Sequence, residues 1–259
     1  MVAFIEHDAP HIFDHIIADR SQFKCSESYM RKYLRTLGWS ERCSTRAAQK
    51  LPPNYQQILS DLFLCQAFII RDHGIPVALC VNTDQTQTHY QMGGKRTWNK
   101  KGENKIVTLG MDEKRAFTLV PSISASGELL PMQTIFHGKT NTSCPSKGAR
   151  CYTEAEGLGF KFEPSHSHTY WSTQATMKSL VNKIIAPYFD AKKKELTLPT
   201  SQCALWMIDC WSVHKSEEFR SWMKDAHSNI IISFVPRNLT GLVQPLDVRI
   251  QRVLKQSMK

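Results

Sequence analysis

ALWMIDCWSVH, residues 204–214, is the stretch from which the rest of the chain is best interpreted. Its apolar start predicts a buried strand over residues 203–208, and that strand ends on the carboxylate of Asp209. A single Asp at a strand end usually has a structural role, as the cap of a turn or of a helix. A catalytic or metal-binding role for Asp209 therefore requires further acids at the same edge of the sheet.

The pattern on either side of this stretch predicts a mixed sheet. Buried or paired strands are expected over residues 77–83, 105–111, 116–124, 129–136, 203–208 and 229–235, with helices from Ser172 or Thr173 and over 216–227. The Ser126-Gly127 turn indicates antiparallel pairing among the early strands, whereas the later strand–helix–strand unit requires a parallel, right-handed crossover. The expected fold class is α/β, with antiparallel N-terminal strands, parallel later strands and flanking helices.

The N-terminal residues predict a small helical segment. Ser26 can cap a helix that has Met30 and Leu34 on one face, and the opposite face is basic, with Arg31, Lys32 and Arg35. Such a helix fits part of a helix-turn-helix DNA-binding module and fits an ordinary helical hairpin equally well. We expect a helical segment over residues 1–50 and one larger domain over 51–259.

The composition favours an anionic partner. Lys and Arg number 33 against 23 Asp and Glu, which gives a formal net charge of +10. An excess of this size suits nucleic acid or an acidic membrane surface, although charge alone is also compatible with a merely basic soluble surface. No run approaches the ~20 apolar residues of a membrane-spanning helix, and the N-terminus lacks the apolar core of a signal peptide. We therefore expect an intracellular chain that does not enter a membrane.

The eight cysteines contain no CxxC pair. Cys144 and Cys151 precede His166 and His168, which raises the alternative of a zinc site, but the spacing fits no common zinc module. Reduced thiols in an intracellular protein are the simpler expectation, and the roles of these four residues stay open.

Two more carboxylates stand in positions like that of Asp209. Asp84 follows the strand 77–83, and Asp247 opens the last helix. Each has a structural alternative, because Asp84 suits a turn and Asp247 suits the positive N-terminus of a helix. Three carboxylates at one sheet edge would repel one another, and a hard divalent cation such as Mg²⁺ would remove that repulsion. Two such ions about 3.5–4 Å apart can support phosphoryl transfer.

Several blocks of sequence together carry a resemblance to a known family. They are VNTDQTQ (81–87), KRTWNKKGE (95–103), KRAFTLVPSISASGELLPMQTIFHGKT (114–140), LWMIDCWSVHKSEEF (205–219) and FVPRNLTGLVQPLDVRIQRVLK (234–255). Over about residues 50–259 the chain resembles the DDE superfamily endonuclease domain of pogo- and Tigger-like, mariner-type transposases. The segment 26–50, with YMRKYLRTLGWS, resembles the tail of the centromere-protein-B-type helix-turn-helix region that precedes this domain.

The resemblance implies an RNase H-like fold and a metal-dependent DNA endonuclease that nicks a strand and then transfers the freed 3′-hydroxyl. It implies that Asp84, Asp209 and Asp247 are the catalytic acids and hold two Mg²⁺ or Mn²⁺ ions. His214 matches a position near the family's active site, with a helix-flanking histidine as the alternative. Gln85 stands where a Glu often follows the first acid, so it would line the same site.

The resemblance also implies DNA as the partner, a nuclear location and a homodimer. On the insert after the first strand, a DNA-contacting loop or a plain solvated turn is expected, with Lys95, Arg96, Trp98, Lys100 and Lys101. The basic helix face would add Arg31, Lys32 and Arg35 to the DNA contacts.

Two other functions are considered beside this one. The chain resembles a transposase cut at both ends, as in a truncated or domesticated copy, and a catalytically inactive, transposase-derived nucleic-acid-binding protein is the alternative to the enzyme. A metal-dependent phosphatase or receiver-like domain is a weaker alternative, because it requires a doubly wound parallel sheet and the early hairpins disfavour one.

Overall fold

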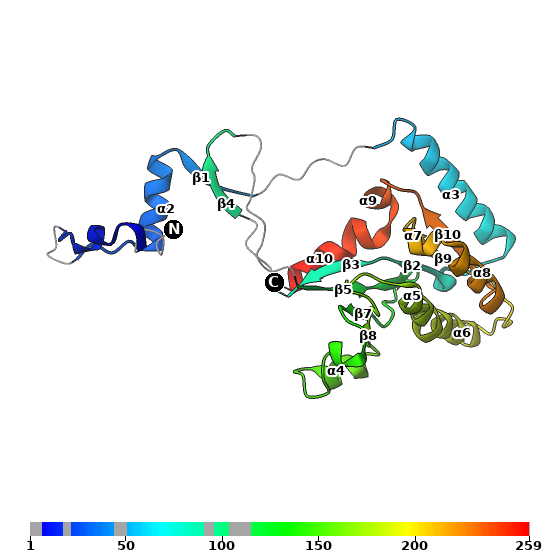
Figure 1. Ribbon diagram of the computed structural model, residues 1–259. Helices are drawn as coiled ribbons and strands as arrows, with labels where there is room; N and C mark the ends of the chain where they lie inside the picture. Colours follow the sequence, from blue (N-terminus) through cyan, green and yellow to red (C-terminus); the bar gives the residue numbers. More distant parts are fainter. Residues whose placement is uncertain (1–6, 18–21, 44–50, 91–95, 104–114, 259) are drawn as a thin grey trace. The chain divides into compact units, whose positions relative to one another are not determined.

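The computed structural model describes residues 7–17, 22–43, 51–90, 96–103 and 115–258. The chain forms two compact units (Figure 1): residues 1–48 with 93–112, and residues 49–92 with 113–259. The predicted strand over 105–111 and the predicted DNA-contacting residue Lys95 lie outside the described residues.

The first unit contains a short helix and a two-stranded ribbon. Helix α2 (Glu27–Thr36) begins at Ser26, whose hydroxyl accepts a hydrogen bond from the backbone N–H of Tyr29. Met30 and Leu34 are buried, whereas the basic side chains of the opposite face are exposed. The helix therefore has the amphipathic character that the sequence predicts. A 3₁₀ helix, η1 (Pro10–Asp14), precedes it.

The basic insert is a strand rather than a loop or a turn. Strand β4 (Arg96–Lys100) pairs antiparallel with β1 (Trp39–Cys43), and Trp98 lies opposite Glu41. The sequence expectation was wrong here because the partner strand lies far upstream, in a stretch without a strand-like apolar pattern. The insert consequently belongs to the same compact unit as helix α2.

The second unit is built on a bent sheet. Its strands are β2 (Cys80–Thr83), β3 (Thr86–His89), β5 (Ala116–Val120), β6 (Ser122–Ser124), β7 (Gln133–Phe136), β8 (Lys161–Pro164), β9 (Ala204–Asp209) and β10 (Ile230–Val235). One half has the order β10-β9-β2-β6 and the other β3-β5-β7-β8. The halves are continuous along the chain, because only Asp84 and Gln85 separate β2 from β3 and only Pro121 separates β5 from β6. Asp84 thus lies at the bend, where its N–H donates to the carbonyl oxygen of Pro121 at 3.2 Å.

Both kinds of strand pairing occur in this sheet. The early pairs β2–β6, β3–β5 and β5–β7 are antiparallel, whereas β2–β9 and β9–β10 are parallel. With helices on its faces, this is the mixed arrangement specified by the RNase H-like expectation, so the predicted fold class is confirmed. Strand β8 is an addition to the expected strands, because none of them falls between residues 141 and 170, and β8 pairs parallel with β7.

Helices cover both faces of the sheet (Figure 1). Consecutive residues of β9 point to opposite faces. Trp206 packs against Phe219 of α8 (Glu217–Ala226), with ring centroids 6.4 Å apart. The sulfur of the next residue, Met207, accepts a hydrogen bond from Gln66 of α3 (Tyr55–Asp72) at 3.3 Å. Helices α8 and α3 therefore lie on opposite faces.

The remaining helical segments complete the second unit. They are η2 (Val77–Leu79), η3 (Asn141–Ser143), α4 (Tyr152–Gly157), α5 (Gln174–Leu180), η4 (Val181–Ile185), α6 (Ala186–Glu195), α7 (Ser212–Lys215), α9 (Thr240–Val243), η5 (Leu246–Ile250) and α10 (Gln251–Ser257). The hydrophobic core lies between one face of the sheet and the helices α5, α6 and α8 that cover this face. Trp206, Phe189 and Phe219 are fully buried there. Within the described ranges, no helix is long and apolar enough to span a membrane.

Candidate active site

The register of two neighbouring strands places the first two acids at the same edge. Strands β2 and β9 are parallel, and Asn82 lies opposite Met207. Asp84 comes two positions after Asn82, directly after β2, and Asp209 comes two positions after Met207, as the last residue of β9. Parallel strands end at the same edge of a sheet, so both carboxylates leave the sheet at its carboxyl edge, as the sequence predicts.

A buried amide brings the third acid to this edge. The Asn82 side chain donates to the carbonyl oxygen of Met207 at 3.1 Å and accepts from the backbone N–H of Leu246 at 3.2 Å. Gln244 adds a second hydrogen bond between this segment and β2, because its side-chain amide donates to the carbonyl oxygen of Thr83 at 3.3 Å. Asp247 follows Leu246 in the first turn of η5 and is thereby held against the end of β2.

Asp84 is the most constrained of the three acids. Its carboxyl group interacts with that of Asp247, and it also accepts a hydrogen bond from the side-chain amide of Gln251. Burial and, next, the nearby Asp247 carboxylate raise the pKa of Asp84 to about 8, although a hydrogen bond from the Gln85 backbone acts in the opposite direction. Asp209 adds a smaller effect of the same sign as Asp247. Asp84 is therefore close enough to each of the other two acids to interact with it.

Asp209 is turned towards a buried histidine. The Nδ1 atom of His214 lies 2.8 Å from Oδ1 of Asp209, and the histidine side chain is only 3% exposed. Its Nε2 atom lies 3.4 Å from Nε2 of Gln85, whose Oε1 accepts a hydrogen bond from Ser172 at 2.7 Å. Gln85 and His214, the two residues predicted to line the site, therefore lie next to each other. Gln85 follows Asp84 in the sequence, and His214 contacts Asp209.

The donor chemistry of the site suits a hard divalent cation. The carboxyl groups of Asp84 and Asp247 lie close enough to interact, and a bound cation would favour the ionised form of both. In the part of the chain that the structure describes, however, no three His, Cys, Asp or Glu side chains form a ready-made metal group. The orientation of Asp209 towards His214 is consistent with this, because its carboxylate is paired with that histidine.

Sequence reasoning missed three buried amides that position the acids. They are Asn82, Gln244 and Gln251, each less than a tenth exposed. Two of them carry a signal in the sequence. Asn82 interrupts the apolar strand pattern, and Gln251 lies four residues after Asp247, which places both on the same face of a helix.

The predicted DNA-contacting residues lie in the first unit, whereas the acids lie in the second. Trp98 is half-buried, and the exposed basic residues are Arg31, Lys32, Arg35, Lys100 and Lys101. Their contacts with DNA stay a prediction.

The cysteines and histidines of the alternative zinc site are not gathered together. Cys144 and His166 line one cavity, His168 lines another, and Cys151 is exposed.

Comparisons with known proteins give one family match and several structural neighbours. A family profile described as DDE superfamily endonuclease matches residues 113–259, more than half of the chain. A search of curated proteins gives no match. Among solved structures, the chain is similar to a pre-cleavage Mos1 transpososome, with 12% identity, a TM-score of 0.49 and coverage of 90% of this chain and 58% of the other. A Mos1 mariner paired-end complex with Mn has 12% identity, a TM-score of 0.47 and coverage of 90% and 57%. The chain thus spans less than two thirds of the length of these solved relatives.

Proposed function

The chain belongs to the DDE superfamily endonuclease family, and from this premise we propose that it is a metal-dependent DNA endonuclease of the transposase type, with Asp84, Asp209 and Asp247 as its catalytic acids. The family match includes Asp209 and Asp247 but begins after Asp84. One observation supports the assignment of Asp84: it directly follows β2, which runs parallel to the strand that ends on Asp209, and its carboxyl group interacts with that of Asp247.

The three carboxylates would hold two Mg²⁺ or Mn²⁺ ions. When bound, such ions activate an attacking oxygen and stabilise the leaving oxygen of a phosphodiester. The chain's own residues would keep the ligands in place: Asn82 fixes the start of η5, Gln251 orients Asp84, and His214 orients Asp209. Ligand orientation of this kind typically affects metal affinity or activity by about 10–100-fold.

The proposal extends to the pogo- and Tigger-like, mariner-type branch that the sequence blocks resemble. It includes DNA strand nicking followed by strand transfer, a nuclear location and a homodimer that would handle two DNA ends. The net charge of +10 supports DNA as the substrate, because basic side chains that neutralise phosphates supply much of the affinity of proteins for nucleic acid.

Nicking of a supercoiled plasmid tests the proposal. The purified protein should convert the plasmid to the open circle with Mn²⁺ or Mg²⁺, and Asp209→Asn should abolish this conversion. Asp225→Asn is the matched control, because Asp225 is exposed on α8 and lies outside the acid cluster. Metal-dependent nicking that survives Asp209→Asn would exclude the assignment.

A second function is favoured by the Asp209–His214 pair, which engages one carboxylate away from the other two. This second function is that of a catalytically inactive, transposase-derived nucleic-acid-binding protein. Its affinity for DNA would fall steeply as the salt concentration rises, and it would cleave DNA with neither Mg²⁺ nor Mn²⁺. Binding that is insensitive to salt would exclude this alternative, and Asp209-dependent nicking would decide for the endonuclease.

A further inference from the structure

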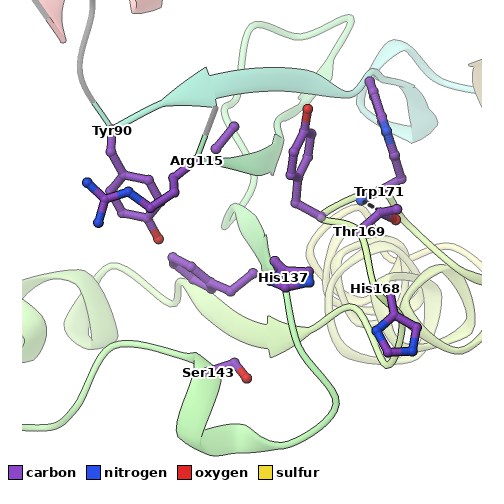
Figure 2. A pocket seen from close by; sticks show the side chains of 10 residues that line it. Tyr90, Arg115, His137, Ser143, His168, Thr169 and Trp171 are labelled. Atoms are coloured by element: carbon purple, nitrogen blue, oxygen red, sulfur yellow. Dashed lines mark hydrogen bonds between the residues drawn. The ribbon is translucent and has the colours of Figure 1, made fainter. Parts of the chain in front are cut away.

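A second site lies on the other half of the sheet. It is a cavity of about 650 Å³, within the range of ordinary ligand pockets, and Figure 2 shows side chains from several separate segments around it. Tyr90 follows β3, Arg115 precedes β5, Phe136 ends β7, and Tyr170 and Trp171 belong to the loop before α5.

The aromatic side chains of this cavity are unusually exposed. Tyr90 is 58% exposed and Trp171 is 45% exposed, although both line a concave surface. Each ring packs against a neighbouring ring: Tyr90 is edge-on to Phe117 at 5.6 Å between centroids, and Trp171 lies 5.4 Å from the ring of Tyr170, which lines the same cavity. Supported and exposed rings in a hollow suit a flat ligand that stacks on them.

The charge of the lining suits an anionic ligand. Figure 2 shows Arg115 beside Tyr90, with its guanidinium carbon 6.0 Å from the centre of that ring. His137 and His168 line the same cavity. Among the described side chains that line it, none is acidic. Stacking surfaces combined with cationic groups are the arrangement by which proteins bind unpaired nucleotides.

The loop that forms one wall also reaches the acid site. Thr118 donates to the carbonyl oxygen of Tyr170 at 2.6 Å, which fixes this loop on β5. Further along the same loop, Ser172 donates to Gln85 at 2.7 Å, and Gln85 lies next to His214. The cavity wall and the residues around Asp209 are therefore joined by one chain of contacts.

Strand geometry limits the separation of the two sites. Tyr90 follows Asp84 by six positions along β3, and an extended strand rises about 3.3 Å per residue, so the Cα atoms are at most roughly 20 Å apart. A single DNA strand spans that distance with only a few nucleotides.

We propose that this cavity holds an unpaired nucleobase of the DNA strand, a few nucleotides from the phosphodiester at the acids. The inference rests on the proposed function only for its substrate class, DNA. The site would engage the strand by stacking on Trp171 and Tyr90, with the basic Arg115 beside Tyr90.

Binding of labelled single-stranded 12-mers, measured by fluorescence anisotropy in EDTA, tests the inference without requiring cleavage. One probe has a mixed base sequence, and the other has the same phosphates with abasic sites throughout. Trp171→Ala and Tyr90→Ala should each weaken the base-containing probe about tenfold and leave the abasic probe unchanged. Trp171→Phe should retain most of the affinity because it keeps a stacking ring.

Phe63→Ala is the matched control, because Phe63 is 53% exposed on α3 and lies outside the cavity. Circular dichroism and thermal unfolding would show that each variant is folded. The inference would be overturned if the parent protein bound the two probes with equal affinity. It would also be overturned if Trp171→Ala lost affinity for both probes to the same extent. If the protein binds the bases but does not nick DNA, the proposed endonuclease activity is excluded and the nucleobase site stands. If it nicks DNA but binds both probes equally, the nucleobase site is excluded and the endonuclease activity stands.

Discussion

The side chain of Asn82 accepts a hydrogen bond of 3.2 Å from the backbone N–H of Leu246, 164 positions later in the sequence. The same amide donates to Met207 in the neighbouring strand. One buried residue therefore joins β2, β9 and the helix that carries Asp247. The three acids come from distant parts of the chain, so their convergence depends on such ties as well as on the sheet.

Asn82→Ala should lower both the stability and the activity of the protein. The substitution leaves the buried N–H of Leu246 without this acceptor, which typically costs about 1–3 kcal/mol. The urea concentration at the midpoint of unfolding should be lower in the variant than in the parent protein. The rate of plasmid nicking should fall by more than the decrease in the folded fraction of the variant accounts for. Asn54→Ala is the control, because Asn54 is exposed, its side chain makes no capping hydrogen bond, and its replacement should change the free energy of unfolding by less than about 0.5 kcal/mol. A nicking rate unchanged in Asn82→Ala would show that this tie does not position Asp247.

Gln251→Leu should weaken metal use while preserving the fold. The Gln251 amide donates to the carboxylate of Asp84, and the replacement keeps a buried side chain of similar size without the donor. The Mn²⁺ concentration for half-maximal nicking should rise about 10–100-fold, because a ligand carboxylate would lose its orienting hydrogen bond. Gln256→Leu, at an exposed position of the same helix, should leave that concentration unchanged. Equal metal requirements in the two variants would contradict the role of Gln251.

Much of the sheet and of the acid edge could be predicted from local patterns. The strands that end on Asp84 and Asp209 are apolar and short, and a strand–helix–strand unit has one preferred handedness, so their common edge followed from general rules. Asp247 was harder, because the loop before it contains no pattern that fixes where it returns. The structure shows that side-chain amides fix that return.

The elements that the sequence did not reveal depend on partners distant along the chain. Strand β4 pairs with β1, although the residues of β1 have no apolar alternation. Strand β8 ends on Pro164 and contains Glu163, whose carboxylate is satisfied by Lys183 at 2.7 Å and by Gln133 at 3.0 Å. The pairing of β4 with β1 and the interactions of Glu163 with Lys183 and Gln133 both come from residues in other elements. The local sequence of β4 or β8 therefore does not reveal them.

His227 should make stability depend on pH in the weakly acidic range. Burial, its largest cause, lowers the pKa of His227 below its usual value, although the charge of Asp190 opposes this. Because the unfolded chain then takes up a proton before the folded chain does, stability should decrease as pH falls through about 6.5. In His227→Gln, the urea midpoint should fall less between pH 7.5 and pH 5.5 than in the parent protein. An identical decrease in both proteins would exclude His227 as a source.

Asp84→Asn should stabilise the metal-free protein and abolish nicking. With a pKa of about 8, the buried Asp84 carboxyl is protonated in the folded, metal-free protein at neutral pH, whereas it is ionised in the unfolded chain, so an uncharged Asn should relieve a cost that folding bears. In EDTA, the unfolding temperature of Asp84→Asn should exceed that of the parent by several degrees, which corresponds to about 1 kcal/mol or more. Mg²⁺ or Mn²⁺ should raise the unfolding temperature of the parent protein and should affect the variant much less, since the variant lacks one carboxylate ligand. Asp225→Asn, at an exposed position on α8, should follow the parent in both conditions. A variant that is less stable than the parent in EDTA and gains as much from added metal would show that Asp84 has a structural role instead of a metal-binding one.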